Sequence, residues 1–191
     1  MRIDWYVLPM PEPRFAICDL DGTLLDSDAA LVGAFLALGV DAADISFGHV
    51  IADECERLGI SLAAYIGAYD TDAAQPFPGV DQLIARLDDW GVCSNKHVSS
   101  GRAELTRLAW TPRSAMFADA FNGPKRLAPM LEALDLEPSR VVFVGDTDHD
   151  RTCARDAGVE FVLAGWNPRA LAHPGDTVLR DPIGLIDVLG L

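Results

Sequence analysis

The pattern of hydrophobic and polar residues predicts a chain in which buried strands alternate with helices. Short apolar runs that end at turn residues are typical of strands buried on both faces. Five such runs occur, at Phe15 to Asp19, Gly91 to Ser94, Ala115 to Ala118, Val141 to Gly145 and Val159 to Leu163. Strands joined through helices form parallel sheets with right-handed crossovers. The pattern therefore predicts an α/β fold with a doubly wound parallel sheet, a Rossmann-like core.

Two segments between these strands carry apolar residues at the spacing of one helix face. Positions i, i+3, i+4 and i+7 lie on the same side of an α-helix. The sets that follow this spacing are Val80, Leu83, Ile84 and Leu87, and Leu127, Met130, Leu131 and Leu134. We expect both helices to pack on the sheet.

Residues 26 to 79, after the first strand, carry helical patterns only. One helix begins at Ser27 and ends at Gly39, and a short third helix covers Ser61 to Ala68. Serine is a favoured N-terminal cap and glycine a favoured terminator. The second helix ends at Gly59 and has a shared apolar face, made of Phe47, Ile51, Cys55 and Leu58.

The sequence Pro76-Phe77-Pro78-Gly79 breaks the helical pattern and returns the chain to the sheet. We therefore expect residues 1–25 and 79–191 to form the α/β core domain, and residues 26–78 to form a small inserted helical domain. A chain of 191 residues is long enough for one sizeable core and one insertion of this size.

Composition narrows the classes of partner and compartment. The formal net charge of −14 excludes a broad basic surface for nucleic acid and argues against binding to anionic membranes. The longest apolar stretch, Ala29 to Val40, is shorter than the roughly 20 residues that span a bilayer. No C-x-x-C pair occurs among the four cysteines, so we expect free, buried thiols in a reducing cytoplasm.

Two carboxylates, Asp19 and Asp21, follow the first strand at a spacing of i, i+2. In an open parallel sheet the strand ends face the ligand crevice. Carboxylates held close together repel each other, and a divalent cation would relieve that repulsion. An ordinary polar turn at Asp21-Gly22-Thr23 is the alternative, and the pair alone leaves both interpretations open.

Polar residues also follow the second predicted strand and precede a predicted helix. Ser94 and Asn95 come directly after an apolar run and offer a hydroxyl and an amide as donors, although an ordinary turn is the favoured explanation for these two residues taken alone. Lys125 lies just before the helix at Leu127, where a cation opposes the helix dipole. This placement suggests a partner elsewhere in the fold, with a surface lysine as the alternative.

A third group of acids follows the strand Val141 to Gly145. Asp146 comes directly after the strand, and Asp150 lies four residues further on, at the start of the next helix. Carboxylates stabilise helix N-termini, so capping can explain Asp148 and Asp150. Capping does not explain Asp146 as well.

Taken in order, the motifs DLDGT, Ser94-Asn95, Lys125 and GDTDHD resemble the four motifs of the haloacid dehalogenase (HAD) superfamily. The resemblance runs from about Phe15 to the C-terminus, and the insertion is similar to the helical cap of that superfamily. The segments Pro76 to Val80, Ser94 to Lys96 and Ala154 to Gly158 are most similar to the phosphoglycolate phosphatase-like branch.

The resemblance implies a Mg²⁺-dependent phosphomonoester hydrolase that works through an aspartyl-phosphate. Asp19 would attack phosphorus, and Asp21 would first protonate the leaving alcohol and then deprotonate water. Asp19, the main-chain carbonyl of Asp21, and Asp146 would hold Mg²⁺. Asp150 would orient Lys125 or a water on the metal.

The same resemblance assigns the phosphate oxygens to Ser94, Asn95 and Lys125. The lysine motif usually reads Lys-Pro, whereas here Arg126 follows Lys125, which makes Arg126 a candidate to share its role. Further candidates for contact with the leaving group are His49, Arg57, Tyr65 and Tyr69, although residues of these types are more often ordinary surface or packing residues.

The expected partner is a small soluble phosphate ester, bound by a monomer or a homodimer. Haloacid dehalogenases lack an acid at the position of Asp21, because a halide leaves without a proton, so Asp21 favours phosphate esters. A phosphomutase of the same superfamily is one alternative, but it would need a second phosphate site in the insertion, whose only arginine or lysine is Arg57. A binding module that has lost catalysis is another alternative, which the intact motif set disfavours.

Overall fold

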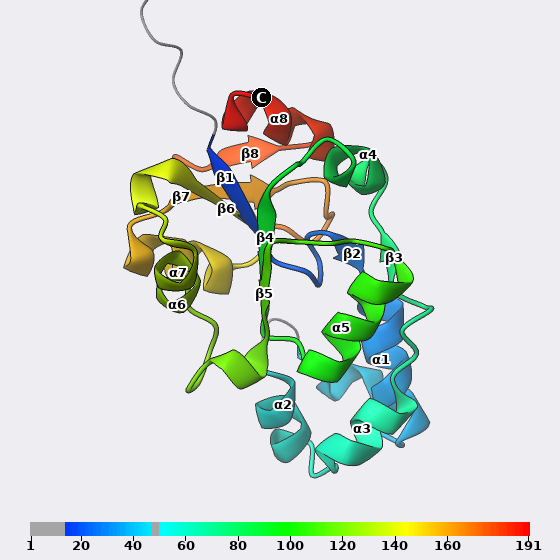
Figure 1. The fold of residues 1–191 in the computed structure, drawn as a ribbon. Coiled ribbons are helices and arrows are strands. Elements are labelled where there is room, and N and C mark those ends of the chain that lie inside the picture. Colours follow the sequence, from blue (N-terminus) through cyan, green and yellow to red (C-terminus); the bar gives the residue numbers. More distant parts are fainter. Residues whose placement is uncertain (1–13, 47–49) are drawn as a thin grey trace, which may run out of the picture.

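A computed structural model describes residues 14–46 and 50–191. The fold is built on a six-stranded sheet with the order β5-β4-β1-β6-β7-β8, and every neighbouring pair is parallel. Its strands are β1 (Phe15–Cys18), β4 (Trp90–Cys93), β5 (Ser114–Met116), β6 (Val141–Gly145), β7 (Glu160–Ala164) and β8 (Thr177–Leu179). Helices lie on both sides of the sheet (Figure 1), which confirms the predicted α/β fold with a doubly wound parallel sheet.

The central strand β1 is buried on both faces. Ala16 and Cys18 belong to one hydrophobic core, whereas Phe15 and Ile17 belong to a second core on the opposite face. Successive side chains of a strand point to opposite faces, so a strand covered on both sides must be apolar throughout. Pairing with β4 on one side and β6 on the other places the ends of these three strands next to each other.

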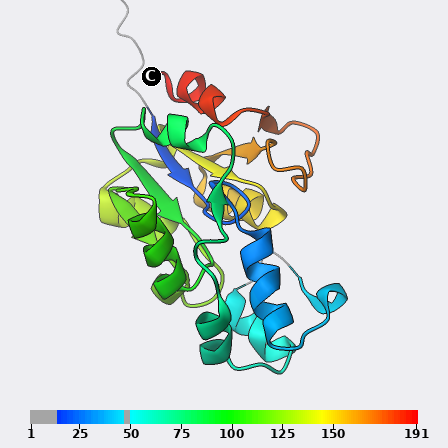
Figure 2. The same ribbon diagram turned by 90° about the vertical axis from the view of Figure 1, so that its right-hand side faces the viewer.

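The helices that cover the sheet divide between its two faces (Figures 1 and 2). On the face of Ala16 lie α4 (Val80–Ile84), α5 (Val98–Arg107) and α8 (Leu185–Leu189), which contribute Leu83, Leu105 and Leu185 to the core. On the opposite face lie α6 (Ala128–Leu134) and α7 (Asp148–Ala157), which contribute Met130 and Ala154. Short 3₁₀ helices cover Ala118–Ala120, Pro138–Arg140 and Pro182–Gly184.

The residues between β1 and α4 have a small core of their own. The helices there are α1 (Asp28–Ala37), α2 (Ile51–Arg57) and α3 (Leu62–Ala68). They enclose Phe35, Cys55 and Tyr65, and the ring centroids of Phe35 and Tyr65 lie 4.7 Å apart. These helices lie at the end of the sheet toward which β1 runs (Figure 1).

Among the described residues, the prediction of helices alone over residues 26 to 79 was wrong only at the two ends of this segment, where short strands form. β2 (Leu25–Asp26) pairs antiparallel with β3 (Gln75–Pro76), which brings the two ends of the segment together. A short 3₁₀ helix also covers Ala42–Asp44. Two-residue strands and single 3₁₀ turns are too short to leave a readable period in a sequence. Phe47, expected on the second helix, lies outside the described residues.

Other differences concern element ends and one edge strand. α4 ends at Ile84, although Leu87 is still buried in the core beyond it. Ala118, expected at the end of a strand, lies in a 3₁₀ helix. β8 (Thr177–Leu179) was not predicted because its three residues, which are partly exposed, make no continuous apolar run.

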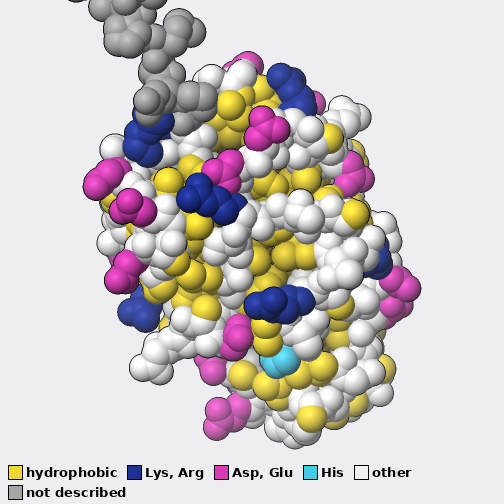
Figure 3. Space-filling view, in the orientation of Figure 1, with side chains coloured by type: hydrophobic (Ala, Val, Ile, Leu, Met, Phe, Trp, Pro, Cys, Tyr) yellow, Lys and Arg dark blue, Asp and Glu magenta, His cyan; other side chains and the backbone are white. Residues whose placement is uncertain are grey.

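The four cysteines, Cys18, Cys55, Cys93 and Cys153, are free and buried, as predicted. Burial raises the pKa of Cys18 to about 12, so its thiol is a neutral packing group at physiological pH. Within the described residues, no helix has the length and apolar character needed to cross a membrane. On the face shown in Figure 3, basic side chains form separate spots among acidic and apolar ones.

Candidate active site

The carboxyl ends of β1, β4 and β6 meet at the edge of the sheet that faces α1 to α3 (Figure 1). Asp19 follows β1, Ser94 follows β4 and Asp146 follows β6. The helices after β4 and β6 lie on opposite faces of the sheet, and such switch points form the ligand crevice of α/β folds. All three residues line one cavity of about 80 Å³.

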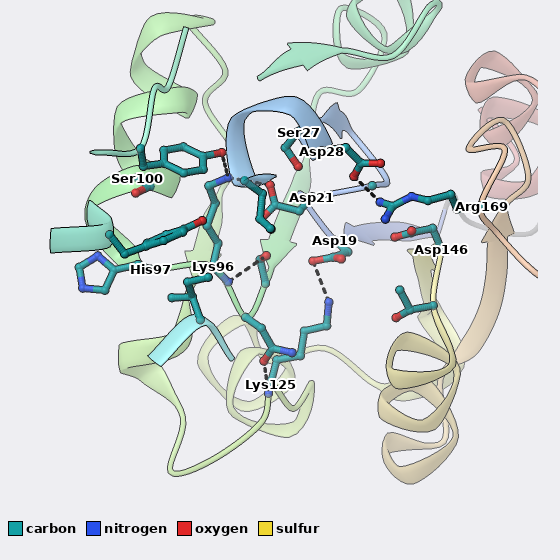
Figure 4. Close-up of a pocket in the computed structure, with 18 residues that line it drawn as sticks. Asp19, Asp21, Ser27, Asp28, Lys96, His97, Ser100, Lys125, Asp146 and Arg169 are labelled. Carbon is teal, nitrogen blue, oxygen red and sulfur yellow. Dashed lines mark hydrogen bonds and ion pairs between the residues drawn. The ribbon is translucent and has the colours of Figure 1, made fainter. Parts of the chain in front are cut away.

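The same cavity collects most of the residues that the sequence motifs indicated (Figure 4). Those that line it are Asp19, Asp21, Ser94, Asn95, Lys125 and Asp146. Asp150 is fully buried and contacts Lys125. Of the further candidates, Tyr65 and Tyr69 line the cavity, whereas Arg57 and Arg126 do not. His49 lies outside the described residues.

Lys125 forms ion pairs with two buried acids. Its Nζ lies 2.7 Å from Oδ1 of Asp19 and 2.6 Å from Oδ1 of Asp150. Burial alone would lower the pKa of Lys125, but the charges of Asp150 and Asp19 outweigh this effect and raise it well above its usual range. Lys125 therefore carries a positive charge between the two acids, although it lies only three residues before Ala128, the first residue of α6.

Three buried carboxylates, those of Asp19, Asp146 and Asp150, offer oxygens within 4.8 Å of one another. Burial raises the pKa of Asp19 to about 6, and Lys125 only partly offsets it. Burial, followed by the charges of Asp19 and Asp150, raises the pKa of Asp146 to about 7. Crowded hard oxygen donors with this excess of negative charge fit a divalent cation such as Mg²⁺.

The turn after β1 holds Asp146 in place. Thr23 Oγ1 donates a hydrogen bond of 3.0 Å to Oδ1 of Asp146. Asn167 Nδ2 donates to Oδ2 of Asp146 at 2.9 Å and to the carbonyl of Gly22 at 2.8 Å. Gly22 has a positive φ of +76°, and a Cβ there would lie only 2.5 Å from Oδ2 of Asp146. Glycine is therefore required both by the turn and by the close approach.

Asp150 has two functions in the structure, one for each of its oxygens. Its Oδ2 accepts hydrogen bonds from the main-chain N–H of Thr147 at 3.0 Å and from Thr147 Oγ1 at 2.6 Å, which completes a capping box at the start of α7. Its Oδ1 faces Lys125. Asp148 is exposed instead and pairs with Arg151. Capping thus explains the contacts of Oδ2 of Asp150, but it does not explain the ion pair of Oδ1 with Lys125.

Asn95 and Ser94 also take part in holding the loops around the cavity. Oδ1 of Asn95 accepts a hydrogen bond of 2.7 Å from the main-chain N–H of Lys125, which fixes the loop that carries this lysine. The hydroxyl of Ser94 accepts a longer bond, 3.3 Å, from the N–H of Lys96. Ser94 and Asn95 are both buried and both line the cavity, so little solvent reaches their side chains.

Sequence reasoning missed a second buried lysine in the site. Nζ of Lys96 lies 2.6 Å from Oδ1 of Asp21, 2.6 Å from Oη of Tyr69 and 2.9 Å from Oε1 of Glu104. Burial raises the pKa of Glu104 to about 7. The charge of Lys96 opposes this rise, and the charge of Asp21 adds to it. One available signal was that Lys96, one of two lysines in the chain, directly follows Ser94 and Asn95.

At the mouth of the cavity, Arg169 pairs with Asp28, a residue of the first turn of α1 (Figure 4). The pair joins the loop after β7 to the helical insertion. Both side chains are more than a third exposed, and ion pairs at such exposure contribute little to stability. The pair is thus a contact that the protein can open at low cost.

Residues 46–164 match the family of haloacid dehalogenase-like hydrolases. This match covers more than half of the chain, and the chain belongs to that family. The matched range includes the positions of Ser94, Lys125 and Asp146, while the strand that carries Asp19 precedes it.

Two curated phosphatases are similar over nearly the whole chain. The sequence is 28% identical over 216 residues to an N-acetylmuramic acid 6-phosphate phosphatase of Pseudomonas aeruginosa, covering 92% of this chain and 94% of that protein. It is 29% identical over 206 residues to a phosphoglycolate phosphatase of Xylella fastidiosa, covering 89% and 90%. A haloacid dehalogenase-like hydrolase from Streptococcus pneumoniae has the same fold, with a TM-score of 0.74 at 20% identity, over 92% of this chain and 98% of that one.

Proposed function

We propose that the chain is a Mg²⁺-dependent phosphomonoester hydrolase that acts on a small soluble phosphate ester through an aspartyl-phosphate intermediate. The observation that carries the proposal is the group of three buried carboxylates within 4.8 Å, with the cation of Lys125 between two of them. The curated relatives that are named as phosphatases support the same reaction class.

In the first step, an oxygen of Asp19 attacks phosphorus. The new P–O bond forms on the carboxylate while the bond from phosphorus to the alcohol oxygen breaks, and Asp21 gives its proton to that oxygen. In the second step, water attacks phosphorus and gives a proton to Asp21. The bond to Asp19 breaks, which releases phosphate and restores both carboxyl groups.

The other residues of the site hold charge and geometry during these steps. Ser94, Asn95 and Lys125 would bind the phosphate oxygens, and Asp150 keeps Lys125 in place. Asp19, Asp146 and the main-chain carbonyl of Asp21 would hold Mg²⁺. When bound there, the ion would neutralise the charge of the phosphate oxygens.

We further propose that residues 26–78 act as a cap over the core formed by residues 1–25 and 79–191. Leu31, Ile51, Tyr65 and Tyr69 of this segment line the cavity together with the carboxylates. A cavity of about 80 Å³ is far smaller than the roughly 300–1,000 Å³ of sites for drug-sized ligands, which favours a small leaving group. The buried free thiols are compatible with a cytoplasmic enzyme, and we expect a monomer or a homodimer.

The alternatives fit the site less well. A phosphomutase needs a cation for a second phosphate in the cap, but Arg57 lies outside the cavity and its Nη2 is 2.6 Å from Oε1 of Glu54. A binding module without catalysis has no need for Asp21 beside a carboxylate cluster and a buried lysine. The complete set therefore favours hydrolysis.

Hydrolysis of p-nitrophenyl phosphate, followed by the absorbance of the phenolate, tests this function. We expect activity with Mg²⁺, none with a chelator, and a loss of roughly 10³-fold or more in kcat for Asp19→Asn, since the nucleophile is gone. Asp148→Asn makes the same chemical change in an exposed acid and serves as the control, with unchanged kcat.

Wild-type activity in Asp19→Asn would contradict the aspartyl-phosphate mechanism. The substrate is a separate question, which a panel of phosphate esters ranked by kcat/KM would answer. The panel includes 2-phosphoglycolate and N-acetylmuramic acid 6-phosphate because the curated relatives are named for them.

A further inference from the structure

A buried cation that the proposed reaction does not use lies next to Asp21. Lys96 follows β4, and its side chain is only 5% exposed. It contacts three groups from three other segments: Asp21 after β1, Glu104 on α5 and Tyr69 directly after α3. Figure 4 shows Lys96 beside Asp21. The phosphate of the substrate already has Lys125 as its cation, so Lys96 needs a different explanation.

The donors of Lys96 are fully used inside the protein. An ammonium group has three N–H donors, and three oxygens lie within 2.9 Å of Nζ, those of Asp21, Tyr69 and Glu104. The hydroxyl of Tyr69 donates in turn to Oε1 of Glu104 at 2.8 Å. Lys96 could bind a substrate oxygen only by giving up one of these contacts, so the geometry is that of a support.

Lys96 contacts one carboxylate oxygen of Asp21, the proton carrier of the proposed reaction. Oδ1 of Asp21 receives the hydrogen bond from Lys96, and the side chain of Asp21 is the more exposed partner, at 27% against 5%. A carboxylate at the rim of a cavity can otherwise turn among several rotamers. One strong bond from a buried, immobile cation selects the rotamer in which the second oxygen is free for the substrate.

Tyr69 makes this support depend on the helical insertion. Its ring lies over the ammonium of Lys96, 4.6 Å from Nζ to the ring centroid, and its hydroxyl contacts both Lys96 and Glu104. If α3 moves away from the core, Lys96 loses one of its three acceptors and the ring that covers it. The position of Asp21 is thus linked to the position of the cap.

We propose that Lys96, held by Glu104 and Tyr69, is the positioning residue that aims Asp21 at the leaving-group oxygen when the cap is in place. The proposal rests on the proposed function, in which Asp21 carries the proton. It adds a division of labour between the two lysines of the chain, in which Lys125 neutralises the phosphate and Lys96 orients the acid.

Leaving groups of different quality test this role. An alkyl phosphate such as glycerol 1-phosphate needs a proton on its leaving oxygen, whereas p-nitrophenolate leaves without one. We expect Lys96→Met combined with Glu104→Gln, which removes the cation without leaving a buried carboxylate alone, to lower kcat/KM for the alkyl ester by about tenfold or more. For the aryl ester, kcat/KM should change by less than about threefold, because kcat/KM reports the steps up to loss of the leaving group and excludes the later hydrolysis of the aspartyl-phosphate, in which Asp21 serves both esters.

Smaller changes repeat the test in case the double variant folds poorly. Tyr69→Phe keeps the ring and removes only the hydroxyl, and it should lower the ratio of alkyl to aryl kcat/KM severalfold. Lys96→Arg, which keeps the charge, should retain more of that ratio than the double variant. Arg107→Met is the control. Arg107 also lies on α5, and it donates a hydrogen bond to the main-chain carbonyl of Ala74, in the segment after α3, instead of contacting Asp21. Its ratio should equal that of the wild type.

Several outcomes would overturn the role of Lys96. An equal loss of kcat/KM for both esters would indicate a structural or phosphate-binding role, and a rise in KM with kcat unchanged would indicate contact with the substrate. An unchanged ratio in the double variant and in Tyr69→Phe would mean that Asp21 needs no support. Each of these results leaves hydrolysis itself intact, whereas a wild-type protein that cleaves neither ester would refute the proposed function along with this one.

Discussion

At the scale of single residues, the site depends on one position that lacks a side chain. Gly22 lets the turn after β1 pass directly against the carboxylate of Asp146, and its main-chain carbonyl accepts a hydrogen bond from Asn167. The two candidate metal ligands Asp19 and Asp146 are held at a fixed separation by this contact. A side chain at this position would displace the carboxylate of Asp146 and so disturb the candidate metal site directly.

We predict that Gly22→Ala lowers Mg²⁺ affinity and kcat, because its Cβ would lie 2.5 Å from Oδ2 of Asp146. It should also destabilise the protein by more than the ~1–2 kcal/mol that a left-handed backbone costs an alanine. Gly59→Ala is the matched control, with a similar φ of +70° but no atom within 4 Å of the added Cβ. Urea unfolding and Mg²⁺ titration of both variants give the comparison, and equal effects would rule out the contact with Asp146.

At the scale of secondary-structure elements, the start of α7 links helix stability to catalysis. Thr147 caps the helix through the N–H of Asp150, at 3.3 Å, and donates its own hydroxyl to the Asp150 carboxylate. The same carboxylate holds Lys125 with its other oxygen. A cap that is ordinary in its geometry thus also orients Lys125, the cation that we propose binds the phosphate.

We therefore predict that Thr147→Ala costs about 1 kcal/mol of stability, as expected for a lost cap, and also lowers kcat, because Asp150 loses one of its anchors. Thr147→Ser should restore most of both. Asp181→Ala removes the cap of a 3₁₀ helix, where Asp181 accepts from the N–H of Ile183 at 3.0 Å, and should affect stability alone. If Thr147→Ala and Asp181→Ala have the same effect on kcat, the link through Asp150 is absent.

Strands with a continuous apolar run could be predicted from the sequence, and those without one could not. β1 and β6 have every residue buried, so their apolar runs are continuous, and the edge strand β5 overlaps the predicted run Ala115 to Ala118. β8 has three partly exposed residues and β2 and β3 have two residues each, so no period marks them. The position of the motif residues could also be predicted, since the carboxyl ends of parallel strands lie together at one end of the sheet.

The network of Lys96, Glu104 and Tyr69 could not be predicted in this way. Lys96 is 75 positions from Asp21 and 27 from Tyr69, and no local pattern links such distant residues. Their contact depends on how α3 and α5 pack together, which one sequence does not specify. A lysine next to a phosphate-binding motif is most simply interpreted as a phosphate ligand or a surface residue, whereas in the structure it supports an acid.

At the scale of the whole molecule, the buried carboxylate cluster lowers the stability of the folded protein when its acids are ionised. Burial raises the pKa of Asp19 to about 6 and that of Asp146 to about 7, both from a usual value of 3.8. Between about pH 4 and pH 7 the folded protein therefore binds more protons than the unfolded chain. Stability then falls as pH rises through this window, because unfolding releases protons that the folded state retains.

A divalent cation should reverse this loss, since it binds the deprotonated carboxylates. We predict that Mg²⁺ at about 100 times its Kd raises the free energy of unfolding by about 2.7 kcal/mol at pH 8, and by much less at pH 5, where protons compete for Asp19 and Asp146. Thermal unfolding with Mg²⁺ or with a chelator at both pH values gives the measurement. Asp146→Asn removes one ligand and one crowded charge, so it should be more stable than the wild type without metal at pH 8 and should lose most of the Mg²⁺ effect. An Mg²⁺ effect of the same size at both pH values would place the ion elsewhere on this acidic protein.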